Sequence, residues 1–295
     1  MKPSAFQYHR PDTVEEAATL LSDLPEAELM AGNQSLGIVM ANRLANPGHL
    51  VDLNAIDDLA YIDADADGVE LGAMARHRDI EESPVLREAY PVLPESASQI
   101  AGPTVRNRGT IGGSIGEADP AGNYPCALVA MGGELELVSA EGTRTVSADE
   151  YFIAYMMTER KEEEIITAAR FPREPFPMSR TGMTFLGQKQ AAQTWPTLSI
   201  ASAVRVDDPE AEDPVVEEAR IAYANAADVP LRVEAVEREV EGEPLTEGAL
   251  GAAGDLAYDE VRPQEEMHAD EVYKRELAEE YTRRALETAY DRAAA

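Results

Sequence analysis

The chain has 295 residues, of which 44% are hydrophobic, and its formal net charge at pH 7 is −31. So negative a surface repels nucleic acid and anionic lipid, and we therefore expect no nucleic-acid partner. No apolar run approaches the roughly 18 residues of a membrane span, and the single cysteine, Cys126, excludes an internal disulfide or a cysteine-ligated iron–sulfur cluster.

The beginning of the sequence and the spread of its charge predict the compartment. The first ten residues hold no apolar core of the kind a signal peptide needs, so we expect a cytoplasmic protein. Acidic residues are spread along the whole chain, which suits a surface solvated at high salt, where repulsion between charges is screened. We interpret the charge as halophilic adaptation. The four histidines have no zinc-ligand spacing, and we predict no metal site.

The first 55 or so residues predict a compact αβ unit. Asp12 or Thr13 is suited to cap a helix over residues 14–21, because acidic residues follow in its first turn. A strand over 27–30 leads into a small-residue loop at 31–35, which is followed by a helix over 36–44 and a strand over 49–53. A strand, such a loop and a helix start together are typical of phosphate binding.

The middle of the chain holds a second glycine-rich stretch. A hairpin over 59–74 and helices near 78–83 and 85–100 precede it, and four glycines then fall within residues 109–116. Glycine lets a ligand approach the main chain, and successive N–H groups turned to one side make a concave anion site. We therefore expect a loop that binds a phosphate, followed by a helix over 121–131.

The remainder predicts further strands and a separate C-terminal unit. Residues 134–138 alternate as a half-buried strand does, and weaker strands are predicted at 144–146 and 164–170. Prolines 172, 175 and 177 mark a boundary. Strands followed by helices then suggest an α+β domain, with strands at 183–186, 199–206 and 219–226 and helices at 232–241, 246–258 and 269–292.

One motif in the central stretch favours a different chemistry. Residues 112–116 fit GxSxG, the nucleophile elbow of serine hydrolases, and Asp255 or Asp259 with His268 would complete a triad around Ser114. The elbow requires a buried strand directly before it, whereas residues 104–110 are too polar for one. A serine hydrolase is therefore a minor alternative.

Five ordered motifs resemble those of a known family. They are A-G-G-x-S-L, L-V-D-[IL], G-A-x-x-x-H-x-x-[IL]-E, R-N-x-G-T-[IL]-G-G-N and A-D-P-A, matched here by residues 31–36, 50–53, 72–81, 106–114 and 118–121. The chain resembles the FAD-binding medium subunit of the molybdenum hydroxylases, the group of xanthine dehydrogenase and carbon monoxide dehydrogenase. The resemblance extends from about residue 4 to residue 290.

The resemblance implies an α+β fold with three units. A small αβ lobe at residues 1–56 and a larger mixed-sheet lobe at 57–172 would clamp FAD. A C-terminal α+β flavoprotein domain at 178–293, with a small antiparallel sheet and helices, would complete the flavin pocket.

The resemblance also implies the cofactor contacts. The first loop and residues 110–114 would hold the FAD pyrophosphate through backbone N–H groups and the hydroxyls of Ser35, Thr110 and Ser114. Flavin-ring contacts would come from near Ile166 and Phe185. It implies no catalytic residue and no metal ligand in this chain. The full predicted FAD site is Met30, Ala31, Gly32, Asn33, Gln34, Ser35, Leu36, Ala101, Thr110, Ile111, Gly112, Gly113, Ser114, Asp119, Asn123, Ile166 and Phe185.

Some positions depart from the family pattern. Asn33 stands where the first loop often has its second glycine, and Asn is the residue that best tolerates a left-handed backbone. Ser114 replaces a common Asn, and Asn123 falls where many members have Asp. Leu186 stands where a basic residue is expected, with Lys189 three positions later. These departures affect the predicted surroundings of the flavin ring.

By resemblance, the chain is an oxidoreductase subunit that passes electrons from partner [2Fe–2S] clusters to FAD and on to an external acceptor. The molybdopterin cofactor would be on a large partner and the clusters on a small one, as a dimer of heterotrimers. Two alternatives stay open beside the hydrolase. One is a free-standing FAD oxidoreductase of the same fold, and the other is a flavin-free scaffold subunit.

Overall fold

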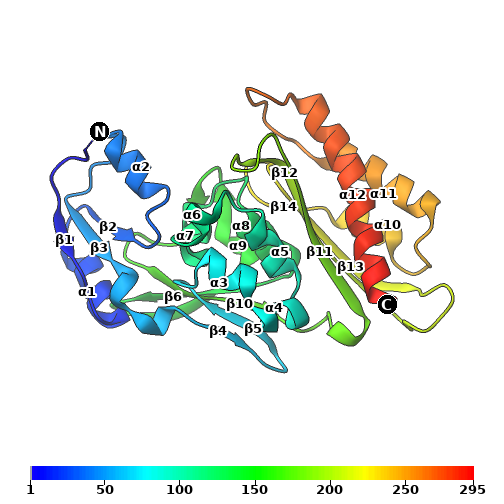
Figure 1. Cartoon of the computed structure of the whole chain (residues 1–295), viewed down its shortest axis with the longest axis horizontal. Coiled ribbons are helices and arrows are strands. Elements are labelled where there is room, and N and C mark those ends of the chain that lie inside the picture. Colours follow the sequence, from blue (N-terminus) through cyan, green and yellow to red (C-terminus); the bar gives the residue numbers. More distant parts are fainter. Residues whose placement is uncertain (1) are drawn as a thin grey trace.

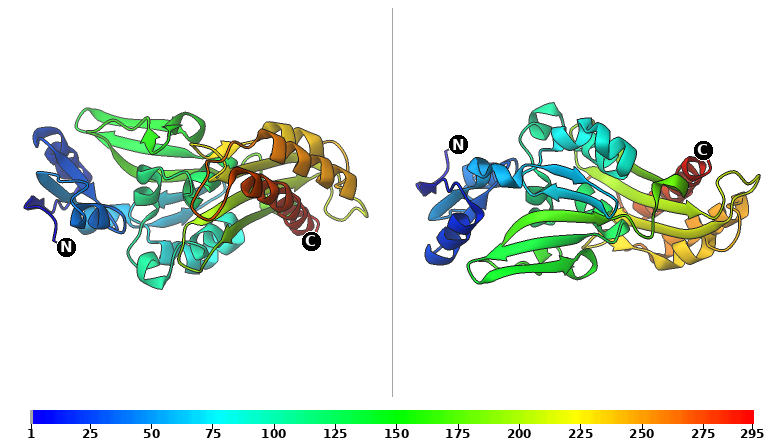
Figure 2. Two further views of the ribbon diagram at one scale, coloured as in Figure 1. Left: turned by 90° about the horizontal axis from the view of Figure 1, so that it is seen from above. Right: turned by 90° about the horizontal axis from the view of Figure 1, so that it is seen from below.

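The computed structural model describes residues 2–295, which contain three main sheets and a two-stranded ribbon. The sheets follow one another along the long axis of the molecule (Figure 1). The N-terminal segment lies at one end and the C-terminal helices lie at the other, as Figure 2 also shows. None of the helices described within residues 2–295 combines the length and the apolar character needed to cross a membrane.

The first sheet is small and parallel. Strand β3 (His49–Asp52) lies between β1 (Gln7–His9) and β2 (Ala27–Met30). Helix α1 (Val14–Asp23) begins where the Thr13 side chain accepts a hydrogen bond from the Glu16 amide, as predicted. Helix α2 (Leu36–Ala41) follows the first glycine loop and ends three residues earlier than predicted.

The second sheet has five strands, and every neighbouring pair is antiparallel, where the sequence predicted a mixed sheet. Helices α3 to α8 follow one another between its second and third strands in the sequence. The strands, in spatial order, are β4 (Ile62–Ala64), β5 (Gly68–Gly72), β10 (Ile165–Pro172), β6 (Glu134–Ser139) and β7 (Gly142–Ser147). The helices are α3 (His77–Glu82), α4 (Pro84–Ala89), α5 (Val92–Ser98), α6 (Pro103–Arg106), α7 (Ile111–Glu117) and α8 (Asn123–Ala130).

A short helix and a ribbon join the second sheet's last two strands in the sequence, and the third sheet follows. The short elements are α9 (Ala148–Tyr151), β8 (Phe152–Ala154) and β9 (Met157–Thr158). The third sheet is antiparallel and consists of β11 (Thr181–Lys189), β12 (Pro196–Val206), β13 (Val216–Ala224) and β14 (Leu231–Arg232). The C-terminal helices are α10 (Glu234–Val240), α11 (Glu247–Glu260) and α12 (Glu271–Ala293).

The third sheet is buried on both faces. Phe185, Ala201 and Ala203 belong to the same hydrophobic cluster as α5 and α8, whereas Ile200 and Val204 pack with the residues of α12. This alternation follows from the two-residue period of a strand. The predicted division into units 1–56, 57–172 and 178–293 stays a prediction, because hydrophobic clusters cross both of its boundaries.

The central glycine stretch is helical, where the sequence predicted a loop. Residues Ile111–Glu117 form α7, and the Thr110 hydroxyl caps it by accepting a hydrogen bond from the Gly113 amide at 3.1 Å. A Cβ at Gly112 would lie 2.8 Å from the Ala73 carbonyl oxygen, so the missing side chain lets α7 lie directly against the end of β5. Tertiary packing thus overrides the low helix propensity of glycine.

Candidate functional site

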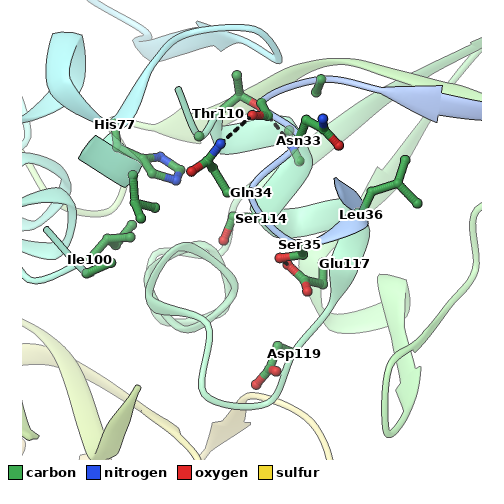
Figure 3. A pocket seen from close by; sticks show the side chains of 18 of the residues that line it. Asn33, Gln34, Ser35, Leu36, His77, Ile100, Thr110, Ser114, Glu117 and Asp119 are labelled. Carbon is green, nitrogen blue, oxygen red and sulfur yellow. Dashed lines mark hydrogen bonds between the residues drawn. The ribbon is translucent and has the colours of Figure 1, made fainter. Parts of the chain in front are cut away.

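A cavity of about 750 Å³ lies where the three sheets approach one another. Figure 3 shows side chains from the first glycine loop, from α7 and from the segment around Ile100 facing it. Its size lies within the range of roughly 300–1,000 Å³ that is usual for ligand sites. The remaining walls come from the beginning of β10 and from the loop between β11 and β12.

The first glycine loop offers unused hydrogen-bond donors. Among the described residues, no acceptor is paired with the amide N–H groups of residues 32–37. Asn33 has a φ of 57°, the left-handed conformation that the sequence led us to expect at this position. The Gln34 side chain donates to the Gly32 carbonyl at 2.9 Å and closes the loop. The loop can therefore hold an anion through its main chain.

The beginning of α7 differs, because its amides are already paired. The N–H of Ile111 donates to the Ala75 carbonyl at 3.1 Å, and that of Gly112 donates to the Ala73 carbonyl at 2.9 Å. The Gly113 amide donates to Thr110 Oγ1, and the Ser114 amide donates to the Thr110 carbonyl at 3.0 Å. The amides of residues 111–114 are therefore paired within the protein in this conformation, and the contact that we predicted from residues 110–114 to a pyrophosphate stays a prediction.

Glycines in and beside α7 instead provide close contacts and space. A Cβ at Gly109 would lie 2.5 Å from Nε2 of His77. At Gly116 a Cβ would meet only the Ile166 side chain, at 3.4 Å, and at Gly113 it would approach the Thr110 hydroxyl at 2.9 Å. Gly113 and Gly116 both line the cavity, so their missing side chains enlarge it.

A hydrogen bond links the first loop to α7 across the cavity wall. Ser35 Oγ donates to Glu117 Oε2 at 2.7 Å (Figure 3). Burial raises the pKa of Glu117 and that of Asp119, which also lines the cavity. These two carboxyl groups can accept hydrogen bonds from ligand hydroxyls. The Ser35 hydroxyl, which we predicted to hold phosphate, is engaged with Glu117.

His77 forms part of the wall beside Gly109. Its side chain is buried, and burial, with smaller effects from Arg76 and Arg106, lowers its pKa to about 4. Its Nδ1 atom has no hydrogen-bond partner within the described part of the chain, and its ring packs against Tyr124. The imidazole is therefore neutral at pH 7.

Cationic side chains hold the wall at residues 99–101. Lys189 Nζ donates to the Gln99 carbonyl at 2.7 Å and to the Ala192 carbonyl at 2.8 Å. Arg106 donates to the carbonyls of Ile100 and Ala101. These bonds also fix the loop that carries Trp195, a residue that is 55% exposed and lines the cavity. An exposed aromatic face of this kind suits stacking on a planar ring.

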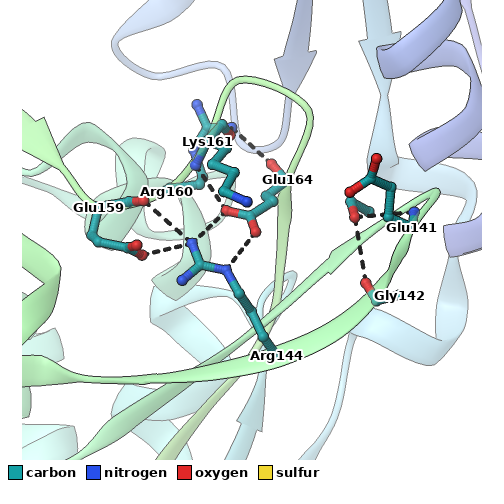
Figure 4. Close-up of polar contacts among 8 residues, drawn as sticks. Glu141, Gly142, Arg144, Glu159, Arg160, Lys161 and Glu164 are labelled. Atoms are coloured by element: carbon teal, nitrogen blue, oxygen red, sulfur yellow. Dashed lines mark hydrogen bonds and ion pairs between the residues drawn. The ribbon is translucent and has the colours of Figure 1, made fainter.

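A polar network positions Arg160 on another wall. Arg144 pairs with Glu159 and Glu164 at 2.6 and 2.5 Å (Figure 4). Arg160 donates to the Glu164 carbonyl at 2.7 Å. The network thus fixes the turn before β10, which brings Arg160 to the cavity.

Most of the residues predicted to contact FAD line this one cavity. Met30, Ile111 and Phe185 do not. Ile111 and Phe185 are buried in the core, although the Phe185 carbonyl accepts a hydrogen bond from Gln99, which does line the cavity. The lining residues are Ala31, Gly32, Asn33, Gln34, Ser35, Leu36, Ala101, Thr110, Gly112, Gly113, Ser114, Asp119, Asn123 and Ile166. Their contact with FAD stays a prediction.

Several lining residues were not predicted from the sequence. Leu29 lies one position before the predicted set, in the strand that the sequence predicted over residues 27–30. Glu117 is within the central motif, and His77 is within the G-A-x-x-x-H motif, so both carried a signal. Gln99, Ile100, Arg160, Gln193, Thr194 and Trp195 carried none, because they are brought to the cavity by distant segments of the chain.

The arrangement around Ser114 does not correspond to a nucleophile elbow. Ser114 lies inside α7, and helix α6 with a turn precedes it in place of a strand. His268 is exposed in the loop before α12, and Asp255 and Asp259 are exposed on α11. The structure therefore argues against the serine hydrolase alternative.

The cavity fits an elongated ligand with an anionic group and a flat ring, as FAD has. The unpaired amides of residues 32–37 suit the phosphates. Gly113 and Gly116 leave room beside them, and Trp195 offers an aromatic face. Glu117 and Asp119 provide acceptors for hydroxyl groups.

Comparisons with known proteins cover almost the whole chain. Residues 4–174 match the family model described as FAD binding domain in molybdopterin dehydrogenase, and residues 185–289 match the CO dehydrogenase flavoprotein C-terminal domain. The carbon monoxide dehydrogenase medium chain of Hydrogenophaga pseudoflava is 36% identical over all of both chains. The nicotine 6-hydroxylase medium subunit of Paenarthrobacter nicotinovorans is 31% identical over 97% of this chain and 98% of that one. A solved carbon monoxide dehydrogenase structure from H. pseudoflava superposes with a TM-score of 0.92 over 99% of each chain.

Proposed function

Since the chain belongs to the family of FAD-binding medium subunits of molybdenum hydroxylases, we propose that it transfers electrons from the [2Fe–2S] clusters of a partner subunit to FAD and on to an external acceptor. The chain is an FAD-dependent oxidoreductase subunit of the carbon monoxide and xanthine dehydrogenase type. Molybdopterin and the clusters are on other subunits in this family.

The observation that carries the proposal is the row of unpaired amides at residues 32–37 on the wall of a cavity of about 750 Å³. Bound FAD supplies the redox chemistry, and the protein supplies binding, orientation and electrostatic tuning. The first loop binds the phosphates through its main chain. Ser114 lines the cavity, and its hydroxyl, which makes no hydrogen bond within residues 2–295, donates to the same part of the cofactor.

The opposite part of the cavity orients the flavin ring. The Trp195 ring stacks on it, and the segment at residues 99–101, which Lys189 and Arg106 hold, forms the wall beside it. Lys189 contributes a positive charge to this wall, whereas the charge of Arg106 is balanced by Glu81 at 2.8 Å. Positive charge near a flavin stabilises its reduced, anionic form. The wall therefore favours acceptance of electrons.

The partners are a large molybdopterin-binding subunit and a small [2Fe–2S] subunit, assembled as a dimer of heterotrimers. The names of the two relatives given above support this assignment, since one is a medium chain and the other is a medium subunit. The mass of the complex purified from its native source tests the assembly. A medium subunit that remains monomeric in the presence of both other chains would contradict it.

The test of the cofactor assignment is direct. The purified chain should bind one FAD non-covalently and show the absorption spectrum of oxidised flavin, which acid precipitation should release into the supernatant. A colourless protein that fails to take up added FAD would contradict the assignment. Reduction of the bound flavin on addition of substrate to the whole complex, and not to the medium subunit alone, tests the electron route.

A further inference from the structure

Two side chains outside the cavity connect the two glycine segments. Arg76 donates through Nη1 to the Arg108 carbonyl and through Nη2 to Oδ1 of Asn54. Asn54 in turn donates through Nδ2 to the Ala31 carbonyl at 2.9 Å. The carbonyls that directly precede Gly32 and Gly109 are therefore linked through one arginine and one asparagine. Neither side chain lines the cavity.

The two glycine segments approach each other so closely at this point that a small change in their relative position would bring their backbones into collision. A Cβ at Gly32 would lie 2.6 Å from the Cα of Gly109. Both segments also present carbonyl oxygens here, those of Ala31 and Arg108, and no main-chain N–H within residues 2–295 donates to either of them. Arg76 and Asn54 supply these donors. Main-chain contact alone would leave the two oxygens unpaired.

The Asn54 side chain is itself held in one orientation. Its Nδ2 atom and its main-chain N–H both donate to Asp52 Oδ1, at 2.5 and 2.9 Å, and the Tyr8 hydroxyl donates to Asp52 Oδ2 at 2.5 Å. Asp52 ends β3 and is only 6% exposed. Strands β1 and β3 of the first sheet therefore fix the asparagine that contacts the first loop.

The main chain around Arg76 is held by its contacts with residues 109–111, at the beginning of α7. Arg76 and Thr110 form an isolated antiparallel bridge, and the Ile111 amide donates to the Ala75 carbonyl at 3.1 Å. The His77 amide donates to the Gly109 carbonyl at 3.0 Å. The Arg76 guanidinium group therefore connects the segment that leads into α7 with Asn54, which contacts the first loop.

We propose that Arg76 and Asn54 are positioning residues that set the distance between the first loop and α7, so that the amides of residues 32–37 meet the FAD phosphates. This inference rests on the proposed placement of the phosphates at the first loop. The charges that act on the Arg76 guanidinium are those of Arg108, Asp79 and Asp52. Because donors fixed before binding need no rearrangement, FAD should bind more tightly to a loop held in this way.

The main variant is Arg76→Met, which keeps the aliphatic stem and removes both donated hydrogen bonds. We expect the dissociation constant for FAD, measured by titrating the full-length apoprotein with FAD, to rise about 10- to 100-fold. Arg76→Lys retains one donor and should recover part of the affinity. The matched control is Arg78→Met, since Arg78 pairs with Glu82 on the exposed side of α3, and its affinity should stay within about twofold of the wild type.

A second variant separates positioning from folding. Asn54→Ala removes the donor to the Ala31 carbonyl without placing a second carboxylate beside Asp52 Oδ1, to which Asn54 Nδ2 also donates, so it should weaken FAD binding more than it lowers the melting temperature of the apoprotein. The effects of Arg76→Met and Asn54→Ala on FAD affinity should not be additive, because both variants break the same connection. Partial recovery in Arg76→Lys, with the flavin spectrum returning to that of the wild type, would not be expected of a merely structural role.

The inference is overturned if Arg76→Met and Asn54→Ala are both folded and bind FAD within twofold of the wild type. It is also overturned if FAD affinity in the two variants falls only as far as it falls in Arg78→Met. A wild-type chain that takes up no FAD would instead contradict the proposed function. Loss of FAD in Gly113→Val with full affinity in both positioning variants would contradict the inference and leave the function standing.

Discussion

The two glycine segments resemble each other in sequence but serve different purposes in the folded chain. In the loop at residues 32–37 the amides have no partner among the described residues, and Asn33 takes a left-handed conformation. At residues 109–116 the amides at the start of α7 are paired, and the glycines provide close contacts or space. The first segment offers hydrogen bonds, and the second gives the ligand room.

This difference shows that a glycine-rich motif has to be interpreted one glycine at a time. Gly109 and Gly112 would clash with His77 and Ala73 if they carried a side chain, whereas Gly116 faces the cavity. Glycine is needed wherever a backbone approaches another group closely, and that group can be protein or ligand. Folding stability and FAD affinity should therefore respond to different substitutions within a single helix.

The largest expected effect comes from Gly113→Val. The side chain would occupy the cavity beside the first loop and displace the Thr110 hydroxyl, which a Cβ would approach at 2.9 Å. We expect FAD affinity to fall at least 100-fold, or about 3 kcal/mol, as measured by FAD titration of the apoprotein. Loss of the cap should cost folding only about 1 kcal/mol.

The matched control for that variant is Gly112→Ala, one residue earlier. Its Cβ would lie 2.5 Å from the Cβ of Ala73, so it should lower the free energy of unfolding by about 1–3 kcal/mol. Its FAD affinity, measured below its melting temperature, should change less than that of Gly113→Val. Full FAD affinity in folded Gly113→Val would contradict the division of roles between the two glycines.

A second prediction tests the packing of His77 on Gly109 through pH. The pKa of His77 is lowered by burial from 6.5 to about 4, so between these values the unfolded state binds a proton that the native state does not. The free energy of unfolding should therefore fall as pH falls from 6.5 towards 4, by about 3 kcal/mol. Above pH 6.5 this contribution is complete.

The measurement is urea unfolding at pH 7 and pH 4.5 for the wild type and His77→Gln. Other groups titrate in both proteins, so the difference between their two pH slopes reports His77. The wild type should lose about 2–3 kcal/mol more than the variant. Equal losses would show that His77 becomes protonated in the folded protein.

A third prediction compares a serine from each segment. Ser114 has a hydroxyl with no hydrogen bond to the described residues, whereas Ser35 donates to Glu117. Ser114→Ala should weaken FAD by roughly 1–3 kcal/mol, as for one hydrogen bond to a charged group. A fluorophosphonate probe should not label Ser114, and stoichiometric labelling in a flavin-free protein would overturn the assignment.

The smallest expected effect concerns the surface that surrounds both segments. With 56 acidic and 25 basic residues, low salt leaves repulsion between carboxylates unscreened. The free energy of unfolding of the apoprotein should rise as KCl is raised to molar concentration. Each 1 kcal/mol of added stability should raise the melting temperature by about 2–4 °C. A melting temperature that does not change with salt would contradict the halophilic interpretation, which stays a prediction.

Much of the local structure was predictable from the sequence. The periodic segments became α1, β6, α11 and α12, because their apolar patterns and caps are local properties of the chain. The main failure was α7, where Thr110 and the contact with Ala73 support a helix that glycine disfavours. Similarly, the local sequence around Ile100 and around Arg160 did not indicate that these residues line the cavity.

The sequence by itself determined the family and its cofactor, since five ordered motifs are present in a chain that is otherwise strongly acidic. It also predicted that both glycine segments belong to one FAD site. The tertiary structure alone decided which segment has free amides, because an amide is free only if no distant carbonyl reaches it. Ala73 and Ala75 reach the amides of α7, and no described residue reaches those of residues 32–37. Hydrogen-bond partners far apart in the chain cannot be inferred from composition or spacing.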